Sequence, residues 1–315
     1  KVLDYIGTGK TDGVFQLESA GMKGFMKELK PHNLEDVIAG ISLYRPGPMD
    51  FIPQYIRGKN DSSSITYDCP QLEPILAPTY GCIVYQEQVM QIVRDLAGYS
   101  LGRSDLLRRA MSKKKAAVME KERKIFIYGD EETGVPGCIK NGIDEQTANK
   151  IYDEMIDFAK YAFNKSHAAA YAVVSYQTAW LKYYFPVEYM AALMTSVIDN
   201  PSKVSEYIYA CRQMNIKILP PDINKGEANF SVDGGDIRYG LAAIKSIGRP
   251  VIKAIVEDRE ELGLFQNLED FITRLSARNI LNKRTIENLI KAGALDTLGG
   301  TRKQFMSIYV QIVDH

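Results

Sequence analysis

Apolar residues recur at helical spacing through most of this chain, and that periodicity constrains the fold more than any other feature. One stripe follows the i, i+3, i+4, i+7 pattern of a helix with a single buried face and consists of Val89, Ile92, Val93 and Leu96. A second stripe begins after Asp144, a residue type that caps helix N-termini, and consists of Ala148, Ile151, Met155 and Phe158. The chain is therefore predicted to be mainly α.

Further helices are predicted between strong helix breakers. The run 166–185, rich in Ala, Tyr and Val, ends at Pro186, which cannot continue a helix. The other helices are expected at 186–198, from Pro201 to near Met214, and at 251–261, 268–275 and 283–292. Strand signal is sparse, and the segment FSVDGGDIRYG predicts one β-hairpin across Asp233-Gly234-Gly235.

The extended segment IKILPPDIN separates two regions, so a domain boundary is expected near 215–222. The predicted organisation is a multi-helix domain at 1–215 and a small α-rich module with a short β-hairpin at 216–300. The stretch 301–315 is interpreted as the truncated start of another helix. A length of 315 residues suits two domains.

Charge is balanced over the whole chain but not along it. Lys+Arg and Asp+Glu both number 39, so the net charge does not indicate a polyanionic partner. Nine basic residues stand against three acids at 101–124, and seven against two at 274–303, as expected of local binding sites. Four separated cysteines indicate neither a zinc site nor disulfides, and fit a reducing cytoplasm. No apolar run reaches membrane-spanning length.

The first candidate binding motif is the segment GYSLGRSDLLRRAMSKKK at 98–115. Ser104 is the expected N-cap of a helix that carries Arg108 and Arg109, and Lys113 shares a face with Arg109 if the helix continues. Guanidinium groups match the geometry of phosphate oxygens, and ammonium groups add point charge. The local pattern supports an alternative equally well. In that alternative Asp105 pairs with both arginines, and the lysines are only exposed to solvent.

The second candidate motif is the segment YAFNKSHAAAYAVVSYQ at 161–177, in which a helix begins near Asn164 and Lys165. A helix start presents unpaired N–H groups and a partial positive charge, and so attracts anions. His167 is equally well interpreted as a neutral capping or core residue. Tyr161 could offer a stacking face, although an aromatic residue before a helix more often serves packing.

The third motif, YGLAAIKSIGRPVIKAIVEDRE at 239–260, has the layout of a helix-hairpin-helix. Its tight turn, Ser246-Ile247-Gly248, can offer backbone N–H groups to consecutive phosphates, with Lys245 and Arg249 beside it. Ser246 stands where glycine is usual, so an ordinary helical turn stays open as the alternative. The segment 281–300 is interpreted as a degenerate second copy that adds positive charge.

Six blocks along the chain together resemble the family C replicative DNA polymerases of bacteria. In family order they are TDGVFQLES, YRPGPM, YGCIVYQEQVMQI, GYSLGRSDLLRRAMSKKK, FNKSHAAAYAVVSYQTAWLKYYFPVEYMAALM and ILPPDIN, and they are spread along the chain from residue 11 to residue 224. The resemblance implies that 1–215 is a polymerase fingers domain and that 216–300 is a helix-hairpin-helix DNA-binding module.

The resemblance also implies the partners and the site residues. The expected partners are dNTPs and primer-template DNA. The residues expected to bind the dNTP are Arg108, Arg109, Lys113, Tyr161, Asn164, Lys165 and His167. Those expected to bind DNA are Lys245, Ser246, Ile247, Gly248 and Arg249. Many relatives have glycine where this chain has Ala162, which restricts the backbone beside Tyr161.

Catalysis in this family requires palm carboxylates that hold two Mg²⁺ ions. The chain contains no Asp-x-Asp sequence. No catalytic residue and no metal ligand is therefore assigned to it, and the isolated chain is expected to be inactive. The palm is expected to precede Lys1, and the sliding clamp and other replisome subunits are expected to bind regions outside the chain.

Two other hypotheses stay open. The chain could be a stand-alone helix-hairpin-helix module of a repair protein, in which 98–115 has no role in binding. It could also be a helical scaffold whose basic blocks only maintain solubility, and such a scaffold would not bind nucleic acid.

Overall fold

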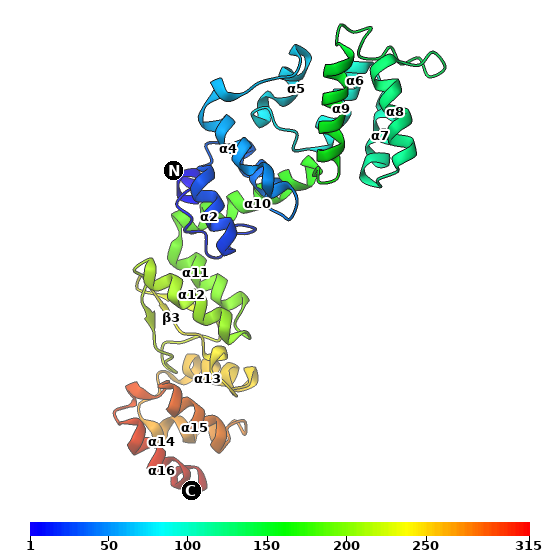
Figure 1. The fold of residues 1–315 in the computed structure, drawn as a ribbon. Helices are drawn as coiled ribbons and strands as arrows, with labels where there is room; N and C mark the ends of the chain where they lie inside the picture. The colour runs from blue at the N-terminus through cyan, green and yellow to red at the C-terminus, as the bar shows by residue number, and fades with distance from the viewer. The chain divides into compact units, whose positions relative to one another are not determined.

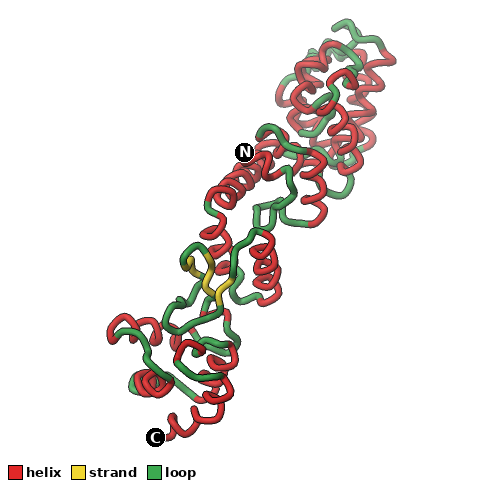
Figure 2. The backbone as a smooth tube through the Cα atoms, turned by 90° about the vertical axis from the view of Figure 1, so that its left-hand side faces the viewer, coloured by secondary structure: helices red, strands yellow, loops and turns green.

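The computed structural model describes residues 1–315, and the fold is mainly α-helical, which confirms the predicted fold class. Its α-helices, six short 3-10 helices (labelled η) and one three-stranded sheet divide into two compact units, Lys1–Ala179 and Trp180–His315. Figure 1 labels the elements, and Figure 2 shows that strands are confined to one short stretch of the backbone. Helix α10 (Lys165–Tyr184) passes from the first unit into the second.

The first unit contains two apolar cores. One lies among α1 (Val2–Ile6), α2 (Ala20–Leu29), α3 (Leu34–Leu43), α4 (Ile52–Asn60) and the part of α10 up to Ala179. The 3-10 helix η1 (Pro48–Phe51) joins α3 to α4, and η2 (Ser62–Ser64) follows α4. Ser19 and Asn33 accept hydrogen bonds from the backbone N–H groups of Met22 and Asp36, which caps α2 and α3.

The second core of this unit lies among five helices, with η3 (Pro70–Leu72) and η4 (Ala77–Thr79) on either side of the shortest one. The helices are α5 (Glu73–Leu76), α6 (Gln86–Ala97), α7 (Leu101–Ser112), α8 (Ala116–Tyr128) and α9 (Glu145–Ala159). The predicted stripe of α6 is buried in this core. Each such aliphatic side chain contributes about 1.5–3 kcal/mol by leaving water. Asp144 caps α9 through the Thr147 N–H, as predicted.

The second unit begins with α11 (Pro186–Ser196) and α12 (Pro201–Gln213), which pack on the sheet. Its strands are β1 (Ile218–Leu219), β2 (Ser231–Asp233) and β3 (Asp236–Arg238), in the order β1-β3-β2. Strand β1 runs parallel to β3, and β2 pairs antiparallel with β3. The predicted hairpin is confirmed, because Gly234 and Gly235 both have positive φ, as the two-residue turn requires.

Four helices and η5 (Leu241–Ala243) surround the last apolar core. The helices are α13 (Arg249–Leu262), α14 (Leu268–Ser276), α15 (Lys283–Ala292) and α16 (Arg302–Asp314), and η6 (Asp296–Leu298) lies between the last two. Asp258 is buried and accepts hydrogen bonds from Arg274 (2.7 Å) and Arg278 (2.8 Å), which ties α13 to the end of α14.

One local prediction is wrong. The N-cap of α7 is Ser100, which accepts a hydrogen bond from the Arg103 N–H, whereas Ser104 lies inside the first turn and donates to the Leu101 carbonyl. The helix therefore begins earlier than expected. The two compact units meet between Ala179 and Trp180. This division reflects which residues pack together and does not test the domain boundaries expected at 215 and 300, so those boundaries stay a prediction. None of the helices is both long and apolar enough to cross a membrane.

Candidate functional site

The start of α6 and the segment before α10 are held together by their backbones. Phe163 donates its N–H to the Val84 carbonyl (3.2 Å) and accepts from the Gln86 N–H (3.0 Å), in a short parallel bridge. The Gln86 side chain also donates to the Ala162 carbonyl (3.3 Å). The residues that begin α10 are thus fixed beside the N-terminus of α6.

The first turn of α10 already has partners of its own. Asn164 caps the helix by accepting from the His167 N–H (3.1 Å), and the Lys165 N–H donates to the Glu87 carboxylate (3.2 Å). The Lys165 ammonium lies 3.2 Å from a carboxylate oxygen of Glu35 and 5.4 Å from the centre of the Tyr85 ring. An anion that approaches this helix start must therefore compete with two carboxylates of the protein.

The imidazole of His167 is exposed and lies between two aromatic rings. Its ring centre is 5.5 Å from that of Phe163 and 4.4 Å from that of Tyr171. Its backbone N–H is the donor that Asn164 caps. The residue therefore has a capping contact through its backbone, while its side chain stays accessible at the start of α10.

The two arginines of α7 share one acid. Arg108 donates twice to the Asp105 carboxylate, at 3.0 and 2.7 Å, and Arg109 lies 2.9 Å from the other carboxylate oxygen. The hydrogen bonds from Arg108 are the main reason that the pKa of Asp105 is lowered, so this carboxylate stays ionised at neutral pH. The pairing alternative is thus present in the structure, although it does not by itself exclude anion binding.

A third contact of Arg108 joins the two motifs. Its guanidinium donates to the Gln86 side-chain oxygen (3.3 Å), and Gln86 in turn holds the backbone at Ala162 and Phe163. The side chain of Arg108 is 22% exposed, whereas that of Arg109 is 61% exposed. We call this connection the Gln86 bridge, and it places Arg108 next to the residues that lead into Lys165.

The remaining predicted residues of this region differ in their surroundings. Lys113 is the C-cap of α7 and is exposed to solvent. Tyr161 is 40% exposed, and one face of its ring lies against Gly47, whose φ is +103°. A Cβ atom at position 47 would fall 2.6 Å from the Tyr161 ring, so glycine is needed there for both backbone and packing reasons.

The predicted helix-hairpin-helix turn leaves a row of backbone donors unused. The N–H groups of Lys245, Ser246 and Gly248 donate to no acceptor of the chain, whereas that of Ile247 closes the turn onto Ile244. Ile247 is buried and anchors the turn, while the other three residues are exposed, as is Arg249. Ser246 adopts a φ of +64°, the left-handed conformation that glycine usually provides. The backbone thus has the conformation of the motif although its first glycine is replaced.

The C-terminal basic block is largely occupied by ion pairs. Besides the two arginines on Asp258, Lys283 pairs with Asp314 (2.7 Å) and Arg302 with Asp296 (2.7 Å). Helices α15 and α16 are joined by a segment in which Gly293 and Gly299 have positive φ, and the degenerate second copy expected at 281–300 stays a prediction. This block contributes fewer available cations than its composition predicts.

Sequence reasoning missed four residues of the first site: Glu35, Gly47, Gln86 and Glu87. Gly47, Gln86 and Glu87 lie in the blocks YRPGPM and YGCIVYQEQVMQI, for which the sequence predicts no binding role. A buried or bridging amide carries no charge signal and no spacing rule, so only the fold reveals that Gln86 joins α7 to α10.

Comparison with known proteins defines the class first. The family model of the bacterial DNA polymerase III alpha subunit finger domain matches residues 1–134, and a helix-hairpin-helix motif model matches residues 215–305. The chain thus combines a polymerase finger region with a helix-hairpin-helix region, as the sequence predicted.

The curated relatives are more specific. DNA polymerase III subunit alpha of Thermus aquaticus is 48% identical over 313 residues, and those of Pseudomonas aeruginosa and Escherichia coli are 49% and 47% identical over 313 and 315 residues. These alignments cover 97–98% of this chain but only 25–26% of each relative. The chain belongs to the bacterial DNA polymerase III alpha subunit family, and it spans about a quarter of the length of these relatives.

Proposed function

We propose that this chain binds the incoming dNTP and duplex DNA as part of a bacterial DNA-directed DNA polymerase. The observation that carries the proposal is the Gln86 bridge, because it brings Arg108 beside the start of α10. Two cationic elements that are far apart in sequence thereby contribute to one site, as binding of a polyanionic triphosphate requires.

The triphosphate would bind by partner exchange. Arg108 and Arg109 are oriented by Asp105, and Lys165 by Glu35, while no substrate is bound. These ion pairs are partly exposed and therefore weak, so replacing a carboxylate with a phosphate costs little. Arg108 is the more buried arginine and is fixed by two residues, so we assign it the largest share of the binding energy.

The other predicted residues take supporting roles in this proposal. Asn164 orders the first turn of α10, Tyr161 presents its uncovered ring face to the nascent base pair, and His167 and Lys113 line the approach. Duplex DNA is held at the second unit, where the unused N–H groups of Lys245, Ser246 and Gly248 support phosphate contacts and the side chains of Lys245 and Arg249 add charge.

The metal ions of nucleotidyl transfer do not fit residues of this chain. No three His, Cys, Asp or Glu side chains lie close enough together to hold an ion. We therefore assign neither a metal ligand nor a catalytic step to the chain. In this proposal the carboxylates that hold Mg²⁺, and the contacts with the sliding clamp and other replisome subunits, belong to other parts of the polymerase.

The first experiment separates DNA binding from catalysis. The purified chain is incubated with labelled primer-template, Mg²⁺ and all four dNTPs, and we expect no primer extension. Labelled duplex titrated at two salt concentrations should bind more weakly at the higher one, because phosphate contacts release counterions. Templated extension by the pure chain contradicts the first expectation, and absence of binding at low salt favours the scaffold hypothesis.

The second experiment tests Arg108 in a full-length alpha subunit that carries this chain. Loss of one positioned donor typically lowers the rate by about 100- to 1000-fold, and we expect Arg108→Ala to fall in this range. Arg103→Ala is the matched control, because Arg103 lies on the same helix, is equally exposed at 22% and pairs with Glu122. Equal rates for the two variants would remove Arg108 from the site.

A further inference from the structure

Arg45 has an unusual environment in the segment between α3 and η1. Its Nε donates to the Ser42 carbonyl (3.1 Å), while its Nη2 is buried and has no hydrogen-bond acceptor. Burial lowers the pKa of Arg45, although a guanidinium remains charged at neutral pH. A buried charged donor without an acceptor is costly and rare, so the contacts that keep it in place indicate what it does.

The Arg45 guanidinium also contacts the ring of Phe163. The guanidinium carbon lies 4.7 Å from the ring centre, within the range of a cation–π interaction. Phe163 is the residue whose backbone is bonded to both Val84 and Gln86, and it directly precedes Asn164. Arg45 thus contacts Phe163, the residue at which the Gln86 bridge meets the start of α10.

A second contact of the same segment supports this interpretation. Gly47, two residues after Arg45, lies directly against the ring of Tyr161. The residues at 45–47 therefore cover side chains on both sides of Ala162. A backbone that turns sharply before a helix needs outside contacts to hold it in one conformation.

We propose that Arg45 is a positioning residue for the dNTP site, acting through Phe163. It fixes the 161–164 segment against α6, and so sets the placement of Lys165 and Tyr161 relative to Arg108. This inference rests on the proposed function of the site. Its failure is distinguishable from failure of that function, because Arg108→Ala reports on the site independently of Arg45.

The test compares variants of a full-length alpha subunit that carries this chain. A displacement of reacting groups by about 1 Å can cost on the order of 100-fold in rate, and we expect Arg45→Ala to raise the KM for dNTP by roughly tenfold and to lower kcat. The affinity for duplex DNA should not change, because the proposed duplex contacts lie in the second unit. Arg45→Lys should restore part of the loss, since it retains a cation over the ring.

The matched control is Arg123→Ala. The guanidinium carbon of Arg123 lies 4.7 Å from the centre of the Tyr152 ring, the same distance as in the Arg45 pair, but on α8 and α9. Arg123 also pairs with Asp153 (2.7 Å), so Arg123→Ala should lower the unfolding temperature, and it should leave the KM for dNTP unchanged. An equal change in KM for Arg45→Ala and Arg123→Ala would overturn the proposal.

A double-mutant cycle with Phe163→Leu tests whether Arg45 acts on the dNTP site through the Phe163 ring. If Arg45 acts through the ring, Phe163→Leu alone reproduces the KM change, and adding Arg45→Ala produces little more. Independent, multiplicative effects would overturn the proposal. Should Arg45→Ala fail to fold, Arg45→Lys and Phe163→Leu still decide it, because both are predicted to raise the KM. If neither raises it while Arg108→Ala lowers the rate, Arg45 has no positioning role but the nucleotide site stands.

Discussion

At the scale of single residues, Ser246 carries the clearest conformational penalty. A left-handed conformation costs a residue with a side chain about 1–2 kcal/mol, and glycine avoids this cost but loses more chain entropy on folding. We expect Ser246→Gly to stabilise the chain by about 0.5 kcal/mol in urea unfolding, and to retain duplex affinity because the N–H groups are backbone atoms. Ser307→Gly, inside α16, should have the opposite sign, because glycine weakens a helix interior. A loss of stability in Ser246→Gly would contradict the assigned strain.

The residue scale also separates what the sequence could reveal from what it could not. Arg108, Lys165 and the turn at 246–248 can be proposed from the sequence because charge and turn residues are visible in it. Gln86 and Arg45 were not assigned roles, because an amide bridge and a buried guanidinium are recognised only through their contacts. The misassigned cap has a similar cause: Ser100 and Ser104 are both suitable caps, and packing of the first turn of α7 decides between them.

At the scale of elements, the N-terminus of α10 combines stability and function in one side chain. Removing an N-cap side chain costs about 1 kcal/mol, so Asn164→Ala should lower stability by that amount. Asn200→Ala removes an equivalent cap from α12, where Asn200 accepts from the Lys203 N–H, and should destabilise similarly. Only Asn164→Ala should also raise the KM for dNTP in the full-length enzyme. A similar rise for Asn200→Ala would mean that the KM reports stability alone.

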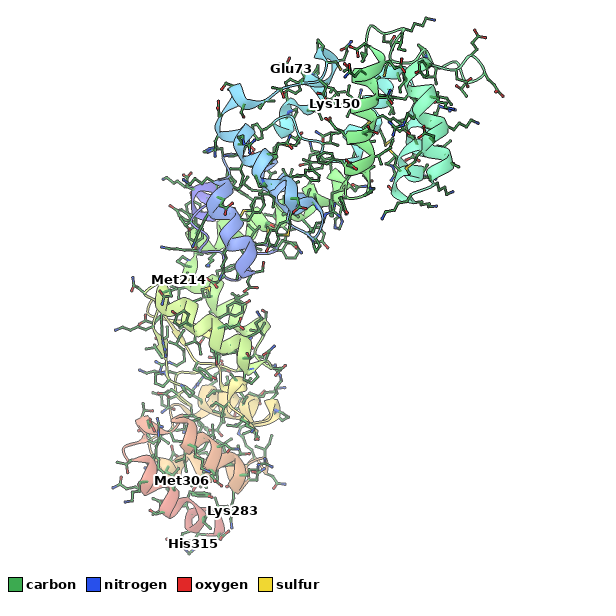
Figure 3. The ribbon with its side chains drawn as sticks, in the orientation of Figure 1. Glu73, Lys150, Met214, Lys283, Met306 and His315 are labelled. Carbon is green, nitrogen blue, oxygen red and sulfur yellow. The ribbon has the colours of Figure 1, made fainter.

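The contact between α9 and the segment 66–72 contains a carboxyl group that should make the free energy of unfolding depend on pH. Glu154 lines a cavity of about 300 Å³ with Asp68 and Lys150, and Lys150 is bonded to Asp68. Figure 3 labels Lys150 on this face of α9. Burial, with a smaller contribution from the adjacent Asp68, raises the pKa of Glu154 from 4.5 to about 7. The native state therefore binds more protons than the unfolded chain between these values, and stability falls as pH rises through that window.

The substitution Glu154→Gln removes the titrating carboxyl group, and with it the pH dependence of stability that this group causes. After allowance for solvent screening, we expect wild type to lose on the order of 1 kcal/mol of unfolding free energy between pH 5 and pH 8 through Glu154, and the variant to lose less. Asp157→Asn is the control on the same helix, because the Asp157 side chain is 70% exposed. Urea unfolding at both pH values measures the difference. An unchanged pH dependence in Glu154→Gln would show that the carboxyl titrates normally.

Helices were the elements best predicted from sequence. The helix expected at 283–292 has those bounds, and the one expected at 268–275 is extended by a single residue. Apolar periodicity and prolines determine such helices locally. The position of the segment 45–47 beside Tyr161 and Phe163, by contrast, depends on contacts between residues more than a hundred positions apart. Local sequence rules do not contain that information.

At the scale of the whole molecule, the proposal assigns two binding functions to two separate units. The dNTP residues all lie within Lys1–Ala179, and the helix-hairpin-helix turn lies within Trp180–His315. Each unit has its own apolar cores, so a surface substitution in one should leave the folding of the other unchanged. Binding of duplex and of nucleotide should therefore respond to different substitutions.

Duplex affinity measured against salt concentration tests this separation. Each phosphate contact contributes about 0.9 to the slope of log K against log salt, so Lys245→Ala with Arg249→Ala should reduce the slope by roughly 2. Arg108→Ala with Arg109→Ala removes the same charge from the first unit and should leave the slope unchanged, while impairing use of dNTP in the full-length enzyme. If both pairs reduce the slope equally, duplex binding depends on overall charge. The two units then share one electrostatic surface, and the assignment of DNA to the helix-hairpin-helix turn is wrong.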